Sequence, residues 1–87
     1  MKKITFFYLD RCPHCKKANQ FIEELFQEHP EYKNIEITRI EEEQTPEKCA
    51  GYDYYYVPCF FYDNKEKAHE GTITKEDMEK VLKGALL

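Results

Sequence analysis

Hydrophobic residues follow strand-like patterns in some parts of the chain and helix-like patterns in others. Residues 3–9 are nearly all apolar, which is typical of a central strand covered on both faces. Between Pro13 and His29, apolar residues recur at three- and four-residue spacing, which predicts an amphipathic helix of about four turns. Pro13 suits the first turn of this helix, and Pro30 helps to end it.

The middle of the chain predicts a strand and a short helix. Residues 35–40 place isoleucines among polar residues, which indicates a half-exposed strand at the edge of a sheet. Thr45 and Pro46 then resemble the N-cap and first position of a short helix. We expect this helix to end near Gly51, because glycine commonly follows a helix C-terminus.

The last third of the chain predicts a hairpin and a terminal helix. Residues 57–62 form another apolar run buried on two faces, and residues 63–65 have the composition of a turn leading into a returning strand at 67–71. Thr74 to Asp77 matches a capping box, with aspartate in place of the preferred glutamate. The predicted order is therefore β-α-β-α-β-β-α within one domain, residues 1–87.

Length and charge exclude several classes of function. The 87 residues suffice for one small hydrophobic core, so a separate cofactor domain is not expected. Thirteen basic against seventeen acidic residues give a net charge of −4, which disfavours binding to nucleic acid. No apolar stretch approaches the roughly eighteen residues needed to span a bilayer. We expect a monomer that acts without nucleic acid or membrane.

The N-terminus resembles a secretion signal only superficially. Lys2 and Lys3 precede an apolar run, but this run is short and is closed by Asp10 and Arg11 without a cleavage site. We therefore expect a cytoplasmic protein in a reducing environment, which disfavours permanent disulfides. In that setting the four cysteines suggest reactive or metal-binding thiols.

A C-x-x-C motif, Cys12-Pro13-His14-Cys15, lies where the first strand meets the first helix. Residues three apart on a first helical turn share one face, so the two sulfurs can form a disulfide without backbone movement. Cys12 is expected at the N-cap, where unpaired N–H groups and the helix dipole stabilise a thiolate. Burial should give Cys15 a higher pKa. These positions predict that Cys12 attacks a disulfide and Cys15 resolves the product.

Four neighbours of the two cysteines are candidate supporting residues. Arg11 and Lys16 add positive charge near Cys12, and Pro13 starts the helix. The imidazole of His14 beside Cys12 can stabilise the thiolate and make the pair easier to reduce.

The motif, the Val57-Pro58 dipeptide before a buried strand and the element order resemble the thioredoxin superfamily, and most of all its small glutaredoxin-like members. This resemblance implies a thioredoxin-like α/β fold whose four-stranded mixed sheet has the order 2-1-3-4. It also implies that Pro58 is a cis-proline facing the active-site cysteines. Tyr56, Val57 and Pro58 would then bind an extended substrate or glutathione, with the backbone of Val57 pairing with it. Glutaredoxins commonly read Thr-Val-Pro here, whereas this chain has Tyr56 at the first position.

The resemblance implies a thiol-disulfide oxidoreductase acting on disulfide-containing proteins or glutathione mixed disulfides. No tightly bound cofactor is needed, although glutathione is a candidate co-substrate. One alternative is a thioredoxin-like protein disulfide reductase served by a flavin-containing thioredoxin reductase. Another, of a different class, is a non-enzymatic metal carrier that uses Cys12 and Cys15. No metal ligands are assigned, because Cys49 and Cys59 have poor spacing for a zinc site.

Three further features allow more than one interpretation. Cys59 follows the predicted cis-proline and is either a third redox thiol or part of the core, whereas Cys49 is expected to pack as a small apolar residue. The tyrosines at 52 and 54–56 either pack on the sheet or line a groove for a partner. The acidic run 41–43 is expected to be a solvated strand end.

Overall fold

Four strands form one mixed sheet in the order β2-β1-β3-β4 in the computed structural model, which describes residues 1–87. The first strand, β1 (Ile4–Tyr8), pairs in parallel with β2 (Ile37–Glu41) and antiparallel with β3 (Cys59–Tyr62). Strand β4 (Lys67–Glu70) pairs antiparallel with β3 at the other edge. The predicted sheet order, the central place of β1 and the edge place of β2 are confirmed.

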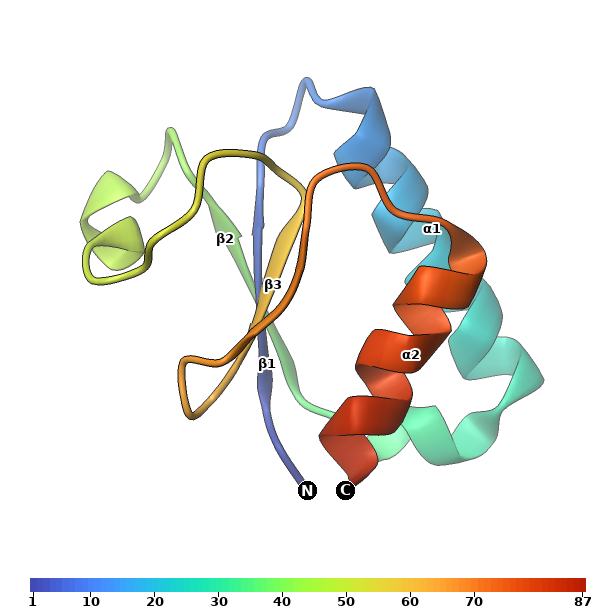
Figure 1. The fold of residues 1–87 in the computed structure, drawn as a ribbon. Coiled ribbons are helices and arrows are strands. Elements are labelled where there is room, and N and C mark those ends of the chain that lie inside the picture. The colour runs from blue at the N-terminus through green and yellow to red at the C-terminus, as the bar shows by residue number, and fades with distance from the viewer.

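The two long helices, α1 (Pro13–Glu28) and α2 (Lys75–Leu86), lie together on one face of the sheet (Figure 1). Their apolar stripes supply most of the larger core, as the three- and four-residue spacing predicted. The buried helical members of this core are Cys15, Ala18, Ile22, Leu25, Met78, Val81, Leu82 and Ala85. The strands contribute Ile4, Phe6, Phe60 and Tyr62 from their helix-facing side.

The opposite face of the sheet carries a smaller core covered by irregular chain. Phe7, Ile40, Cys59 and Phe61 are buried there, under the segment that contains the short helix η2 (Pro46–Cys49). The rings of Tyr52 and Tyr54 lie 4.8 and 4.9 Å from that of Phe7. Because both faces of β1 and β3 are covered, these strands are apolar almost throughout.

The tyrosines at 52 and 54–56 therefore form two pairs, one for each of the two interpretations that the sequence allows. Tyr52 and Tyr54 pack against the sheet, whereas Tyr55 and Tyr56 are 85% and 70% exposed. Only the second pair is free to contact a partner.

The N-cap positions of α2 and η2 were both predicted correctly, but only α2 has a side-chain cap. Thr74 accepts a hydrogen bond from Asp77 N, and the Asp77 carboxylate accepts one from Thr74 N, so α2 begins with the predicted capping box. Thr45 and Pro46 likewise occupy the predicted N-cap and first position of η2, a single 3₁₀ turn, but the Thr45 hydroxyl donates to Glu41 O and makes no capping hydrogen bond. A second 3₁₀ helix, η1 (Pro30–Asn34), was not predicted, because its apolar residues are too few to show a period.

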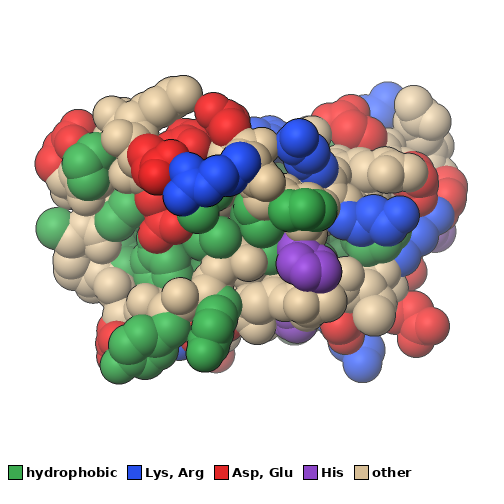
Figure 2. Space-filling model, turned by 90° about the horizontal axis from the view of Figure 1, so that it is seen from above, with side chains coloured by type: hydrophobic (Ala, Val, Ile, Leu, Met, Phe, Trp, Pro, Cys, Tyr) green, Lys and Arg blue, Asp and Glu red, His purple; other side chains and the backbone are tan.

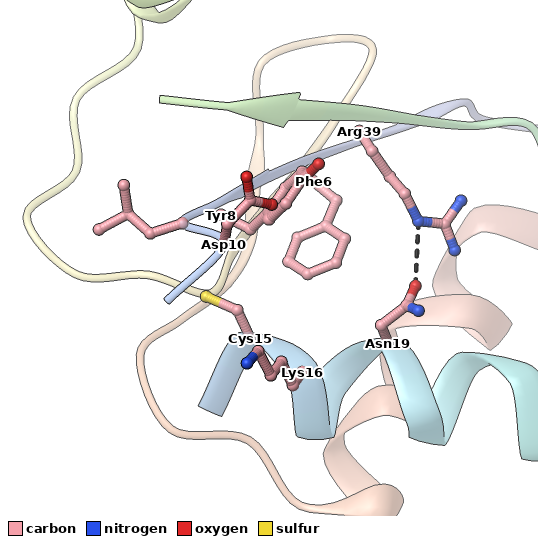
Figure 3. Close-up of a pocket in the computed structure, with 8 residues that line it drawn as sticks. Phe6, Tyr8, Asp10, Cys15, Lys16, Asn19 and Arg39 are labelled. Atoms are coloured by element: carbon pink, nitrogen blue, oxygen red, sulfur yellow. Dashed lines mark hydrogen bonds between the residues drawn. The ribbon is translucent and has the colours of Figure 1, made fainter. Parts of the chain in front are cut away.

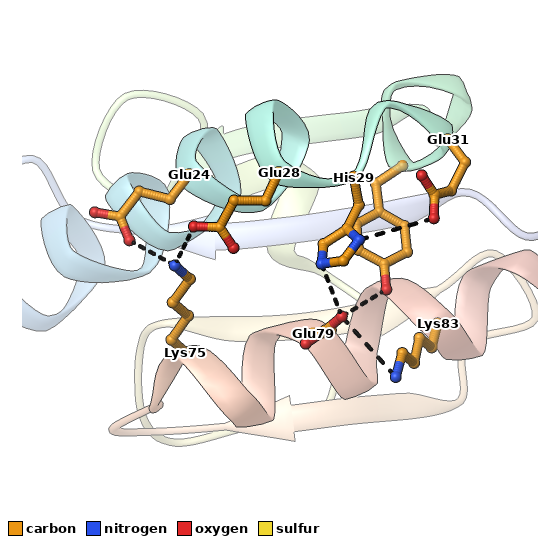
Figure 4. A network of polar contacts seen from close by, with 8 residues as sticks. Glu24, Glu28, His29, Glu31, Lys75, Glu79 and Lys83 are labelled. Atoms are coloured by element: carbon orange, nitrogen blue, oxygen red, sulfur yellow. Dashed lines mark hydrogen bonds and ion pairs between the residues drawn. The ribbon is translucent and has the colours of Figure 1, made fainter.

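Polar contacts join α1 and its C-terminal extension to α2 (Figure 4). Lys75 Nζ lies 3.2 Å from Glu24 Oε1 and 2.6 Å from Glu28 Oε2. At the other end of the contact, the Tyr32 hydroxyl donates to Glu79 Oε2 at 2.9 Å. These contacts fix α2 along α1 and keep both helices against the same face of the sheet.

The two ends of the chain lie side by side at one end of the sheet (Figure 1). The backbone N–H of Lys2 donates to Ala85 O at 2.6 Å. With 16 and 12 residues, neither α1 nor α2 combines the length and hydrophobicity needed to cross a membrane.

Candidate active site

Cys12 occupies the N-cap of α1, as its sequence position predicts. Its backbone is extended, Pro13 begins the helix, and the Cys15 N–H donates to Cys12 Sγ at 3.3 Å. The sulfur is partly exposed at the positive end of the helix dipole. A thiolate here gains both a hydrogen bond and the favourable potential of the unpaired helix N–H groups.

Cys15 lies one helical turn further on and faces the core. Its side chain is only 3% exposed. Burial, followed by the interaction with Cys12, raises the pKa of Cys15 to about 12. The two thiols therefore differ in exposure as predicted: Cys12 is partly exposed, whereas Cys15 is buried and has a raised pKa.

The segment containing Val57 and Pro58 faces Cys12 from the other side. The peptide bond between these two residues is cis, as the resemblance implied, and Cys12 Sγ lies 4.0 Å from Val57 O. Pro58 itself is buried, and its carbonyl accepts a hydrogen bond from Gly71 N at 2.8 Å. Residues 45 positions apart in sequence are thus brought together around one sulfur.

Glu70, at the end of β4, holds the segment that leads to Val57. One carboxylate oxygen of Glu70 accepts hydrogen bonds from Tyr55 N at 2.5 Å and from Tyr56 N at 2.9 Å. The other oxygen lies 2.7 Å from Lys67 Nζ. The Lys67 ammonium and the two backbone N–H groups lower the pKa of Glu70 to about 2. This role was not predicted, because nothing in the sequence separates Glu70 from a solvated glutamate of an edge strand.

Glu70 is expected to make the stability of the protein depend on acid pH. Its pKa falls from 4.5 to about 2 on folding, so its contribution is complete above about pH 5 and is lost as the pH falls toward 2. Glu70→Gln should therefore reduce the free energy of unfolding at neutral pH and have almost no effect near pH 2. Urea titrations followed by circular dichroism between these pH values measure the difference.

The matched control for this experiment is Glu47→Gln, which removes the charge of an exposed glutamate in η2. It should leave the pH dependence of unfolding unchanged. An equal loss of stability for Glu70→Gln at every pH would contradict the assigned role.

The acidic run 41–43 is not the solvated strand end that was expected. Glu41 is 6% exposed, and its carboxylate accepts hydrogen bonds from the backbone N–H groups of Asp10, Glu43 and Gln44. These three hydrogen bonds lower the pKa of Glu41, and the bond from Asp10 N–H has the largest effect. Its neighbour Glu42 accepts a hydrogen bond from the Tyr54 hydroxyl at 2.5 Å. The run therefore fixes the loop that precedes Cys12.

The predicted supporting residues are on the surface around Cys12. His14 and Lys16 are exposed on the first turn of α1, and Arg11 forms an ion pair with Glu43 that balances part of its charge. Viewed from the end of the sheet where α1 begins, the surface shows hydrophobic, histidine and basic side chains together near its centre, with acidic ones on both sides (Figure 2). This end of the molecule is accessible to a large substrate.

The structure does not bring Cys59 to the two motif cysteines. Cys59 is fully buried in the smaller core, on the face of the sheet opposite Cys15, and burial raises its pKa to about 12. Cys49 packs against the same smaller core. No group of three or more His, Cys, Asp or Glu side chains is arranged to hold a metal ion.

The site thus combines an accessible thiol, a buried thiol one turn away and an adjoining backbone carbonyl. Two sulfurs on one helical turn can exchange electrons with an external disulfide by forming and breaking a bond between themselves.

Comparison with known proteins finds a matching family and a relative that both extend over nearly the whole chain. A family model described as thioredoxin matches residues 2–84. The thioredoxin of Methanocaldococcus jannaschii is 31% identical over 84 residues, covering 97% of this chain and 95% of the relative.

Solved structures agree on the fold. The oxidised thioredoxin of Plasmodium falciparum superposes with a TM-score of 0.73 at 17% identity, covering 95% of this chain and 79% of that one. A thioredoxin-like protein from Clostridium perfringens gives a TM-score of 0.67 at 25% identity, covering 98% and 71% of the two chains.

Proposed function

Because the chain belongs to the thioredoxin family, we propose that it is a thiol-disulfide oxidoreductase whose attacking thiol is Cys12 and whose resolving thiol is Cys15. The observation that carries the assignment is the placement of Cys12: it caps α1, accepts a hydrogen bond from Cys15 N and faces Val57 O. His14 and Lys16, exposed on the same turn, add donors and charge around the reacting sulfur.

The first step is attack of the Cys12 thiolate on a substrate disulfide. A bond forms between Cys12 Sγ and one substrate sulfur, and the other substrate sulfur leaves as a thiolate. The helix N-terminus and the Cys15 N–H stabilise the attacking anion before reaction. An extended substrate segment lies along Val57 and Pro58, whose backbone faces Cys12.

The second step is attack of Cys15 on Cys12. The sulfur of Cys15 forms a bond to Cys12 Sγ, and the bond between Cys12 and the substrate breaks, releasing the reduced substrate. The product is an enzyme with a disulfide between Cys12 and Cys15. An external reductant then restores the two thiols. No bound cofactor takes part, since the electrons move between sulfur atoms.

We further propose that the substrates are protein disulfides and that the reductant is a flavin-containing thioredoxin reductase. Similarity to a thioredoxin over nearly the whole chain supports this alternative over the glutaredoxin-like one. The exposed Tyr55 and Tyr56, next to Val57, offer rigid contact area for a protein partner. A reducing cytoplasm is the compartment that suits this activity.

A redox titration in glutathione buffers tests the choice of pathway. Free thiols are trapped with an alkylating reagent, and each species is weighed by mass spectrometry. We expect a two-electron transition linking Cys12 and Cys15 at about −270 mV, the range of thioredoxin, without a glutathione adduct.

An adduct on Cys12 with a midpoint of about −200 to −230 mV would instead place the protein on the glutathione pathway. Failure to form any disulfide between Cys12 and Cys15 would contradict the proposed function itself.

A further inference from the structure

The segment 53–57 reaches Cys12 without belonging to any helix or strand. None of its backbone groups forms a hydrogen bond with another backbone group. Its N–H groups at Tyr55 and Tyr56 instead donate to Glu70 Oε2, at 2.5 and 2.9 Å. These are the only hydrogen bonds that link the backbone of residues 53–56 to the rest of the protein.

Side-chain packing fixes the chain on either side of these two tyrosines but not at them. The ring of Tyr54 packs on the buried Phe7, and Pro58 is fully buried. Between these points, Tyr55 and Tyr56 are mostly exposed and contribute nothing to either core. The backbone just before Val57 therefore depends on the Glu70 carboxylate for its position.

Glu70 is itself held in place by the sheet and by an ion pair. Its backbone belongs to β4, which pairs with β3, and its second carboxylate oxygen lies 2.7 Å from Lys67 Nζ. The next residue, Gly71, donates its N–H to Pro58 O at 2.8 Å. The end of β4 thus holds the chain on both sides of Val57.

No cavity lies at Val57 to receive a substrate. The one cavity of the molecule, of about 280 Å³, lies beside the buried thiol, and Figure 3 shows Cys15 and Asn19 of α1 facing Phe6 of β1 across it. None of its lining residues comes from the segment 53–58. A substrate that pairs with Val57 therefore binds on open surface, where the backbone supplies the contacts.

We propose that Glu70 is a positioning residue for substrate binding, which keeps the Val57 carbonyl toward Cys12 before a substrate arrives. The inference rests on the function proposed above. An extended substrate then meets a backbone that is already ordered. Without the carboxylate, the cost of ordering residues 55–57 is added to the free energy of binding, whereas bound substrate reacts as before. A small disulfide that does not extend along Val57 is insensitive to the change.

Two substrates with the same leaving group test this role. One is a linear peptide whose single cysteine carries a coloured aromatic thiol as a mixed disulfide, and the other is the symmetric disulfide of that thiol. Cys12 attacks the peptide sulfur, because the aromatic thiolate is the better leaving group. Reduced protein in a Cys49→Ser background is mixed with an excess of either substrate, and the first phase of thiolate release is followed against substrate concentration.

Glu70→Ala should raise the half-saturating concentration of the peptide about tenfold and leave its maximal rate within about twofold. The reaction with the small disulfide should also stay within about twofold. Glu70→Gln keeps an oxygen that can accept the two N–H groups, so it should restore most of the peptide affinity. Amide hydrogen exchange measured by NMR should be faster at Tyr55 and Tyr56 in Glu70→Ala.

Two control variants separate positioning from charge and from stability. Glu66→Ala removes the same charge from the turn that precedes β4. Tyr62→Phe is expected to lower stability at the end of β3 that lies away from Pro58. Neither should change the reaction with either substrate, under conditions in which circular dichroism shows every variant to be folded.

An unchanged half-saturating concentration of the peptide in Glu70→Ala would overturn the assignment of Glu70. Equal slowing of both substrates would also overturn it, because altered reactivity of Cys12 would then explain the effect. An equal effect of Glu66→Ala or Tyr62→Phe would do the same, since charge or stability alone would suffice. Release of thiolate from neither substrate by the original protein would instead contradict the proposed function.

Discussion

Replacing Cys12 with serine is expected to lower the rate of protein disulfide reduction on the order of a thousandfold or more, because serine supplies no thiolate to attack sulfur. Cys15→Ser should also stop turnover, but at a later point. Its Cys12 can still attack, so a covalent mixed disulfide with the substrate should accumulate. Reduction of insulin with dithiothreitol as electron donor measures the first effect, and non-reducing electrophoresis with mass spectrometry detects the second.

Cys49→Ser is the matched control, since it removes a partly buried thiol that packs against the smaller core. It should retain full activity. Residual activity in Cys12→Ser near that of the original protein would contradict the assignment of the nucleophile. The same variant tests the metal-carrier alternative: stoichiometric zinc or copper in anaerobically purified protein, lost in Cys12→Ser, would favour a carrier.

The largest effect on stability is expected from Gly84→Ala. A Cβ atom at Gly84 would lie 2.1 Å from the Tyr62 hydroxyl oxygen and 3.1 Å from its Cζ. The ring cannot easily move, because Tyr62 is buried and its hydroxyl donates to Val81 O at 2.8 Å. Overpacking of this kind costs about 1–3 kcal/mol, so we expect a net loss of about 2 kcal/mol despite the higher helix propensity of alanine.

A double-mutant cycle tests the cause of that loss. Tyr62→Phe alone should cost about 1 kcal/mol, because it removes the hydrogen bond to Val81. Combined with Gly84→Ala, it removes the closest clash, so the double variant should be more stable than the sum of the single changes predicts. Urea denaturation measures all three proteins, with Lys80→Ala as a surface control on α2. Strict additivity would contradict a direct clash.

Features encoded within a few neighbouring residues were predictable from the sequence. Cys12 as the N-cap of α1 and Thr74 with Asp77 as the capping box of α2 depend on residues at most three apart. The central place of β1 and the edge place of β2 also followed, because a continuous apolar run marks a central strand and a mixed run marks an edge, whereas the full sheet order came from the resemblance to the thioredoxin superfamily.

Features that depend on strand register or on distant contacts were not predictable. Cys59 lies opposite Phe7, so the register of β1 and β3 decides which face its side chain joins. An apolar run buried on both faces has no alternation from which to read that face. The roles of Glu41 and Glu70 likewise depend on loop N–H groups brought to them by the fold.

The close approach of the two chain ends also allows circular permutation and fusion of the protein. Because Lys2 N hydrogen-bonds to Ala85 O, a short peptide linker can join the ends and allow the chain to be opened elsewhere. Both ends lie at the opposite end of the sheet from the start of α1 (Figure 1). A surface, a fluorescent label or a second domain attached at either end therefore leaves the reactive sulfur pointing outward.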